Sequence, residues 1–170
     1  EQGVDEFLAT TLTVLENIIL GTEPLTSFWS QKKQAYKKLQ ELSERFGLLI
    51  NPDARIADLT VGEKQRVEII KALYRDASIL ILDEPTAVLT PQESEQLFKV
   101  LKEMVKAGLS IMFISHKLNE ILEISDRIVV LRHGKLVGEV ATKNASKESL
   151  AEMMVGRKVT RPAYEKLKKG

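Results

Sequence analysis

Two adjacent carboxylates follow a run of large apolar residues near the middle of the chain. Residues 79–86 read ILILDEPT, so Asp83 and Glu84 come directly after four apolar side chains. Such an unbroken run is typical of a strand buried on both faces of a parallel sheet, and open α/β sheets bind ligands at the carboxyl ends of their strands. There, Asp83 would hold Mg²⁺ through its water shell, and Glu84 would orient or deprotonate an attacking water. The alternative is a core strand that ends in a solvated acidic turn.

Two further segments accompany this one, and together they resemble the ATPase domain of ABC transporters. Residues 59–66 (LTVGEKQR) are similar to the signature motif of that family, and residues 79–84 are similar to its Walker B strand. The sequence Ile114-Ser115-His116 resembles its switch histidine, and residues 11–18 (TLTVLENI) resemble the segment that opens its helical subdomain.

Within that family, the sequence most resembles those of the ATPases of simple-sugar and nucleoside importers. These proteins share the sequence EPTAVLTP, found here at residues 84–91, and a valine in place of the first glycine of the signature, here Val61. The resemblance covers roughly residues 10–157.

The resemblance implies roles for several side chains. Thr60 and Gly62 would bind the γ-phosphate of an ATP held by the opposite subunit, since a hydroxyl, a close backbone and a helix N-terminus all favour an anion. Glu63 replaces the usual glutamine; it either brings negative charge near that anion or points away as an ordinary first-turn stabiliser. His116 would contact the γ-phosphate. Gln2 is the candidate for the glutamine that couples Mg²⁺ to the membrane subunit, and a frayed or altered chain end is the alternative.

One expected motif is absent from these 170 residues. A P-loop requires the pattern G-x-x-x-x-G-K-[ST], and the only Gly-Lys pair, Gly134-Lys135, is followed by Leu136. The chain therefore resembles the C-terminal two-thirds of an ATPase domain, either as a part of a longer protein or as a natural truncation. In both cases we expect the chain by itself to be a poor ATPase, because phosphate affinity depends mainly on that loop and its lysine.

Composition narrows the class of protein. The length suits one domain, and 44% hydrophobic and 29% charged residues are ordinary for a globular chain. The net charge of +1 gives no electrostatic reason to expect nucleic acid as a partner. Cysteine is absent, which excludes disulfides and thiolate metal sites and fits a cytoplasmic protein. No apolar run approaches a membrane span, so we expect peripheral association with the inner or plasma membrane through permease subunits.

The rest of the pattern predicts the elements that position these residues. We expect helices at 12–20, 31–46, 62–75, 90–108, 117–124 and 146–155, a loop at 22–30, and strands at 79–82, 109–114, 127–132 and 135–140. The buried helical faces should include Ala35, Leu39, Leu42, Phe46, Val67, Ile70, Tyr74, Leu97, Leu101 and Met104.

The predicted fold class is α/β. We expect a P-loop NTPase-like core of mostly parallel sheet with an inserted α-helical subdomain and without the N-terminal P-loop part. A partial ATPase domain would cover residues 1–157, with the helical subdomain at about 12–75 and the α/β core part at about 76–157. Residues 158–170 would be a basic tail or linker.

The functional prediction is a fragment of the ATP-hydrolysing subunit of an ABC importer for sugars or nucleosides. Its cofactors would be ATP and Mg²⁺, and its partners a second ATPase domain and transmembrane permease subunits. Two alternatives stay open: a non-catalytic module that docks a membrane subunit, and the ATPase head of a DNA-maintenance protein, which would need long heptad arms.

A last expectation concerns the sheet. In the families that the chain resembles, the P-loop strand lies between the two strands expected here at 109–114 and 127–132. Without it, two apolar edges would lack partners, so we expect either closure between them or association of copies, and we favour association.

Overall fold

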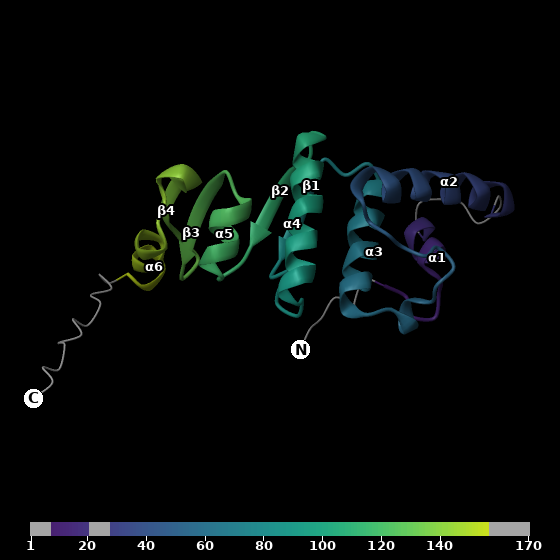
Figure 1. Ribbon diagram of the computed structural model, residues 1–170, viewed down its shortest axis with the longest axis horizontal. Helices are drawn as coiled ribbons and strands as arrows, with labels where there is room; N and C mark the ends of the chain where they lie inside the picture. The colour runs from purple at the N-terminus through teal and green to yellow at the C-terminus, as the bar shows by residue number, and fades with distance from the viewer. Residues whose placement is uncertain (1–7, 21–27, 157–170) are drawn as a thin grey trace, which may run out of the picture. The chain divides into compact units, whose positions relative to one another are not determined.

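The computed structural model describes residues 8–20 and 28–156 and divides the chain into two compact units, residues 1–114 and 115–170 (Figure 1). The division falls within the predicted α/β part, because the helices before residue 75 and the first pair of strands pack in the same unit. The predicted boundary near residue 75 and the predicted tail stay predictions, and residues 158–170 lie outside the described part.

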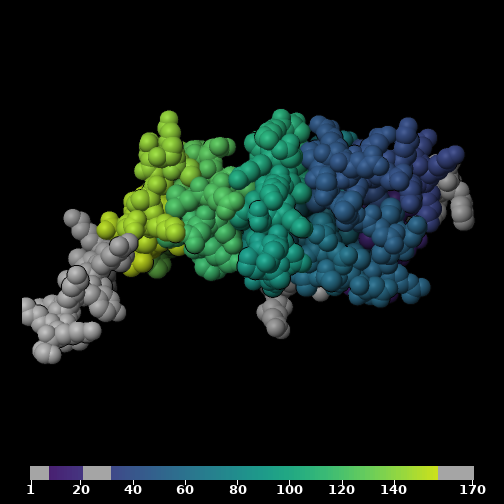
Figure 2. Space-filling view, viewed as in Figure 1, coloured from purple at the N-terminus to yellow at the C-terminus, as the bar shows by residue number. Residues whose placement is uncertain are grey.

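The first unit begins with three helices around an apolar core. These are α1 (Val14–Ile19), α2 (Phe28–Phe46) and α3 (Val61–Tyr74), and a short 3-10 helix, η3 (Ile56–Asp58), precedes α3. All three α-helices contact one another, and α2 and α3 form a continuous surface in Figure 2. Their packing excludes water from the following apolar side chains: Val14, Leu15, Ile18, Ala35, Leu39, Phe46, Leu48, Ile56, Val67, Ile69, Ile70 and Leu73.

Helix α2 differs from the prediction at its start and along its apolar face. It begins at Phe28 instead of Gln31, so the predicted loop over 22–30 is wrong at its C-terminal end. No proline or glycine interrupts residues 28–30, and nothing local prevents the helix from extending backwards over them. Leu42 is only half-buried, although Ala35 and Leu39 are fully buried as predicted.

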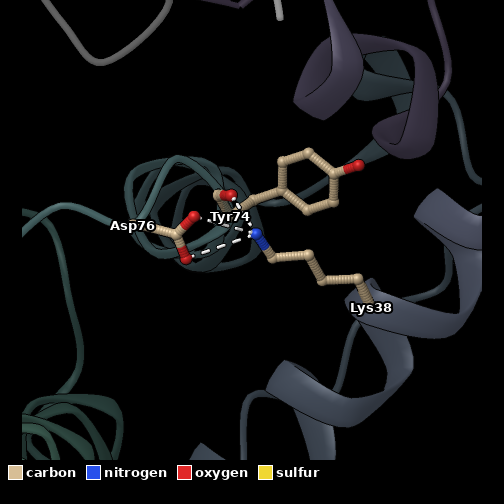
Figure 3. Close-up of polar contacts among 3 residues, drawn as sticks. All are labelled: Lys38, Tyr74 and Asp76. Atoms are coloured by element: carbon tan, nitrogen blue, oxygen red, sulfur yellow. Dashed lines mark hydrogen bonds and ion pairs between the residues drawn. The ribbon is translucent and has the colours of Figure 1, made fainter.

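Helix α3 is tied to α2 at its C-terminal end. Lys38 of α2 donates hydrogen bonds to the Tyr74 carbonyl oxygen (2.8 Å) and to the Asp76 carboxylate (3.2 Å), and its ammonium lies 4.8 Å from the centre of the Tyr74 ring (Figure 3). The last carbonyls of a helix lack intrahelical donors, and a cation there also complements the helix dipole. Tyr74, which was predicted to be buried, is only half-buried, and its neighbour Leu73 is buried instead.

Two parallel strands and one helix complete the first unit. Strands β1 (Ile79–Asp83) and β2 (Ser110–Ile114) pair in parallel, with Ile81 opposite Met112 and Asp83 opposite Ile114. Helix α4 (Pro91–Lys106) connects them, and Thr90 and Glu93 form a capping box at its start. Leu97, Leu101 and Met104 are buried as predicted, and Phe98 packs edge-on against Phe113 of β2 at 5.9 Å.

The prediction that the β1 strand is buried on both faces is wrong. Ile79 and Ile81 are 63% and 61% exposed, and their neighbours Met112 and Ile114 on β2 are 56% and 44% exposed. Side chains of a strand alternate between the two faces, so these four share one face of the strand pair, opposite the face that contains Leu80 and Phe113. Full burial of a parallel strand requires a covering layer on each side.

The second unit has α5 (Leu118–Ile124), β3 (Arg127–Arg132), β4 (Lys135–Ala141), a 3-10 helix, η4 (Thr142–Asn144), and α6 (Lys147–Val155). Strands β3 and β4 form an antiparallel hairpin, which turns at His133 and Gly134 with positive φ angles of 51° and 72°. Ile128, Val130 and Leu150 form its core. The two strands and the last helix were predicted, and Ser146 caps α6.

Within the described residues, each sheet has two strands, β1 with β2 and β3 with β4. The expected association of copies stays a prediction. None of the helices in the described part is long and apolar enough to cross a bilayer.

Candidate functional site

The turn after β1 holds the two predicted acidic residues. Asp83 is exposed at the last position of the strand, and Glu84 follows it with a positive φ of 45°. The Glu84 N–H donates to the Ile114 carbonyl oxygen at 2.9 Å, and the Glu84 carbonyl accepts from the Ala87 N–H at 3.0 Å. The backbone of the turn is therefore fixed on one side by β2 and on the other by the turn itself.

The side chains at this turn suit a divalent cation that takes few of its ligands from the protein. Among the described residues, no group of three His, Cys, Asp or Glu side chains is placed to bind a metal ion. Mg²⁺ in nucleotide sites, however, is commonly bound by one or two carboxylates together with waters and phosphate oxygens. At this turn Asp83 supplies one exposed carboxylate.

A second turn, at the start of α3, contains the three predicted signature residues. Thr60 is the N-cap, and its hydroxyl accepts from the Glu63 N–H at 3.3 Å. The Glu63 carboxylate points back and accepts from the Thr60 N–H and from the Thr60 hydroxyl, both at 2.8 Å. Of the two positions predicted for Glu63, the side chain adopts the one that caps its own helix.

These hydrogen bonds also set the charge state of Glu63. The bond from the Thr60 backbone N–H is the largest cause that lowers the pKa of the Glu63 carboxyl; the bond from the hydroxyl adds to it, and the nearby Arg66 guanidinium contributes in the same direction. Slight burial opposes them. Glu63 is therefore a stable carboxylate at neutral pH.

Gly62 lies against the beginning of α4. A Cβ atom at this position would lie 3.2 Å from Glu93 Oε1 and 3.4 Å from Leu89 Cδ2. Both distances are at or below ordinary van der Waals contact, so a larger residue at this position would require Glu93 or Leu89 to move. Gly62 thus allows the start of α3 to lie close to Leu89 and Glu93, whether or not a ligand also approaches its backbone.

One hydrogen bond joins the two turns directly. The side-chain amide of Gln65, one turn into α3, donates to the carbonyl oxygen of Pro85 at 2.8 Å. Pro85 is buried and immediately follows Glu84. This role of Gln65 was not predictable from the sequence, because the bond spans twenty residues and no local pattern indicates it.

Two further predicted site residues do not belong to these turns. His116 belongs to the second unit, where it is exposed in the loop between β2 and α5. Gln2 lies outside the described residues. The first unit therefore contains Asp83 and Glu84 on one turn and Thr60, Gly62 and Glu63 on the other, and the Gln65–Pro85 hydrogen bond links the segments that carry them.

The order of these turns along the chain agrees with a known family. The model of the ABC transporter family matches residues 2–87, which is half of the chain. The chain belongs to the ABC transporter family. The match includes the start of α3 and the turn after β1, so the family pattern covers the two turns described above.

Several relatives of this ABC transporter chain are named as import proteins. It is 52% identical to the nucleoside import ATP-binding protein NupA of Lactococcus lactis over 90% of its length, and 50% identical to the guanosine import ATP-binding protein NupO of Bacillus subtilis over 90%. It is also 41% identical to the ribose import ATP-binding protein RbsA of Clostridium tetani over 96%. The chain spans about a third of the length of these relatives, namely 30%, 30% and 33%.

Solved structures agree on the fold. cbiO1 from Clostridium perfringens, part of the ABC transporter complex cbiONQ, superimposes with a TM-score of 0.71 at 27% identity and covers 91% of this chain and 59% of its own. The ATP-binding cassette MJ0796, a dimer bound to ADP and Pi, gives 0.63 at 26% identity over 84% of this chain and 61% of its own. The ABC transporter chain thus has the predicted P-loop NTPase-like fold of ABC ATPase domains.

Proposed function

We propose that this chain is part of the ATP-binding, ATP-hydrolysing subunit of an importer of sugars or nucleosides. The names of its relatives support the transport class. The observation that carries the catalytic part is the turn at Asp83 and Glu84, which is fixed at the carboxyl ends of two parallel strands, where α/β sheets bind ligands.

In this proposal each residue has one task. Glu84 orients or deprotonates the water that attacks the γ-phosphate. Asp83 would hold Mg²⁺ through its water shell, and the bound ion would supply charge neutralisation at the phosphates. His116 would contact the γ-phosphate, and Gln2 would couple the ion to the membrane subunit.

Thr60 and Gly62 act on a second nucleotide. They would bind the γ-phosphate of an ATP held by another ATPase domain in a head-to-tail dimer, with the N-terminus of α3 favouring the anion. The dimer of MJ0796 supports such an arrangement. Because the Thr60 hydroxyl already bonds to the Glu63 carboxylate, phosphate would have to take over that donor. Transmembrane permease subunits are the further partners, and they would hold the protein at the cytoplasmic face of the membrane.

The test uses the full-length polypeptide that contains this chain. Glu84→Gln keeps the size of the side chain but removes the base, so ATP binding should persist while hydrolysis falls by about 10²-fold or more. Glu95→Gln, an exposed glutamate of α4, is the matched control and should hydrolyse ATP at the wild-type rate. Unchanged turnover in Glu84→Gln would remove Glu84 from the mechanism and favour a non-catalytic docking module.

A further inference from the structure

The backbone of Glu84 has a conformation that this residue type rarely adopts. Its φ of 45° lies in the left-handed region, where the Cβ of an L-residue is close to its own carbonyl oxygen. Such a conformation persists only where the surrounding structure holds it, and it is concentrated at functional sites. The position of the Glu84 side chain therefore depends on the contacts that hold this turn.

Among the hydrogen bonds at Glu84 and its neighbours in the turn, three have different origins. The bond from the Glu84 N–H to Ile114 and the bond from the Ala87 N–H to Glu84 belong to the strand pair and to the turn. The third comes from outside: the Gln65 amide of α3 donates to the Pro85 carbonyl, and that carbonyl belongs to the residue directly after Glu84. Only the amide N–H of Gln65 can make this bond, because a carbonyl oxygen accepts and cannot donate.

A second contact joins the same two segments at another point. Gly62, one turn before Gln65, packs against Leu89 and Glu93. Arg66 is near both ends of this contact: its charge contributes to the lowered pKa of the Glu63 and Glu93 carboxyls. The first two turns of α3 are thus held to residues 85–93 at two separate places.

We propose that Gln65 is a positioning residue for Glu84. Through its hydrogen bond to Pro85, it couples the turn at Thr60–Glu63 to the turn at Asp83–Ala87 in the same chain. This inference rests on the proposed function, because Glu84 must be the base for its position to affect turnover. A displacement of Thr60 and Gly62 by a phosphate would then reach Glu84 through one helical turn and one hydrogen bond.

The experiment replaces the donor without changing the shape of the side chain. Gln65→Met in the full-length polypeptide retains length and volume but cannot donate to Pro85. We expect kcat for ATP hydrolysis to fall about tenfold, since small displacements of a catalytic group have effects of this order, while KM changes less than about threefold. Gln96→Met, an exposed glutamine of α4, is the matched control and should leave both constants unchanged.

A second substitution tests the direction of the bond. Gln65→Glu also retains the shape but places an acceptor against the Pro85 carbonyl, so it should lower kcat more than Gln65→Met does. A kcat equal to that of the control in both variants would overturn the proposal, and so would an effect on KM alone.

A double-mutant cycle separates positioning from a general loss of structure. If Gln65 acts through Glu84, adding Gln65→Met to Glu84→Gln should lower kcat by less than about twofold further, because the group that it positions is already gone. A full additional tenfold loss would overturn the proposal while leaving Glu84 as the base. An inactive Gln65→Met beside a fully active Glu84→Gln would instead overturn the proposed function itself.

Discussion

At the scale of single residues, Glu63 shows where sequence reasoning stops. From the motif alone, the Glu63 carboxylate could either cap its own helix or face a bound anion. The two positions differ only in the side-chain rotamer, which the sequence does not specify. In the structure the carboxylate caps α3, and the same arrangement recurs with Glu16 on α1 and Glu93 on α4. Asp83 and Glu84 were predictable from a local pattern, whereas Gln65 was not.

The three capping glutamates predict how stability depends on pH. Hydrogen bonds from the backbone and hydroxyl of the N-cap threonines lower the pKa of each carboxyl below its ordinary value of 4.5. A lowered folded-state pKa contributes stability that is present above the unfolded value and is lost as the pH falls through the folded value. Below about pH 4.5 the chain should therefore lose part of its free energy of unfolding.

Urea unfolding of this chain between pH 7 and pH 3 measures this loss. A variant with glutamine at positions 16, 63 and 93 retains neutral acceptors, so its free energy of unfolding should change less below pH 4.5 than that of the wild type. The control carries glutamine at three exposed glutamates that cap no helix, namely Glu41, Glu44 and Glu95. Equal pH dependence in the capping variant and the wild type would contradict the prediction.

At the scale of elements, caps and turns were predictable and layers were not. Thr90 with Glu93, Ser146 and the His133-Gly134 turn act through neighbours in sequence, and the structure has all three. The second face of β1 is different: Ile79 and Ile81 are as apolar as a doubly covered strand requires, but whether a layer covers them is a tertiary property.

The link between α2 and α3 gives a test at this scale. Lys38→Met retains the alkyl stem but removes the ammonium that bonds to the Tyr74 carbonyl and to Asp76. We expect the free energy of unfolding to fall by about 1 kcal/mol, the order of one hydrogen bond at a helix C-terminus. Lys37→Met is the matched control, because Lys37 forms only an exposed pair with Glu41 among the described contacts; it should cost less than about 0.5 kcal/mol. Equal losses would show that the α3 terminus does not depend on Lys38.

At the scale of the whole molecule, the open face of the β1–β2 pair is the feature that should most affect behaviour in solution. Ile79, Ile81, Met112 and Ile114 are exposed together on it. A contiguous apolar surface of this kind favours association. We therefore expect the isolated chain to associate at high micromolar concentration, which light scattering would measure.

A charge at the centre of this face should oppose association. Ile81→Lys should lower the average mass, because Ile81 lies directly opposite Met112. Val105→Lys, at an exposed position of α4, is the control and should leave the mass unchanged. A wild-type chain that is monomeric at these concentrations would contradict the prediction.

The left-handed backbone at Glu84 implies a trade-off between folding stability and the proposed ATP hydrolysis. Glycine or asparagine tolerates a positive φ far better than glutamate, so either residue would relieve a strain of about 1–2 kcal/mol while removing the proposed base. Under the proposed function, a search for more stable variants of the full-length polypeptide would therefore select protein without the base at this position. Protein engineers who improve that polypeptide by folding or expression alone should expect to lose hydrolysis first at residue 84.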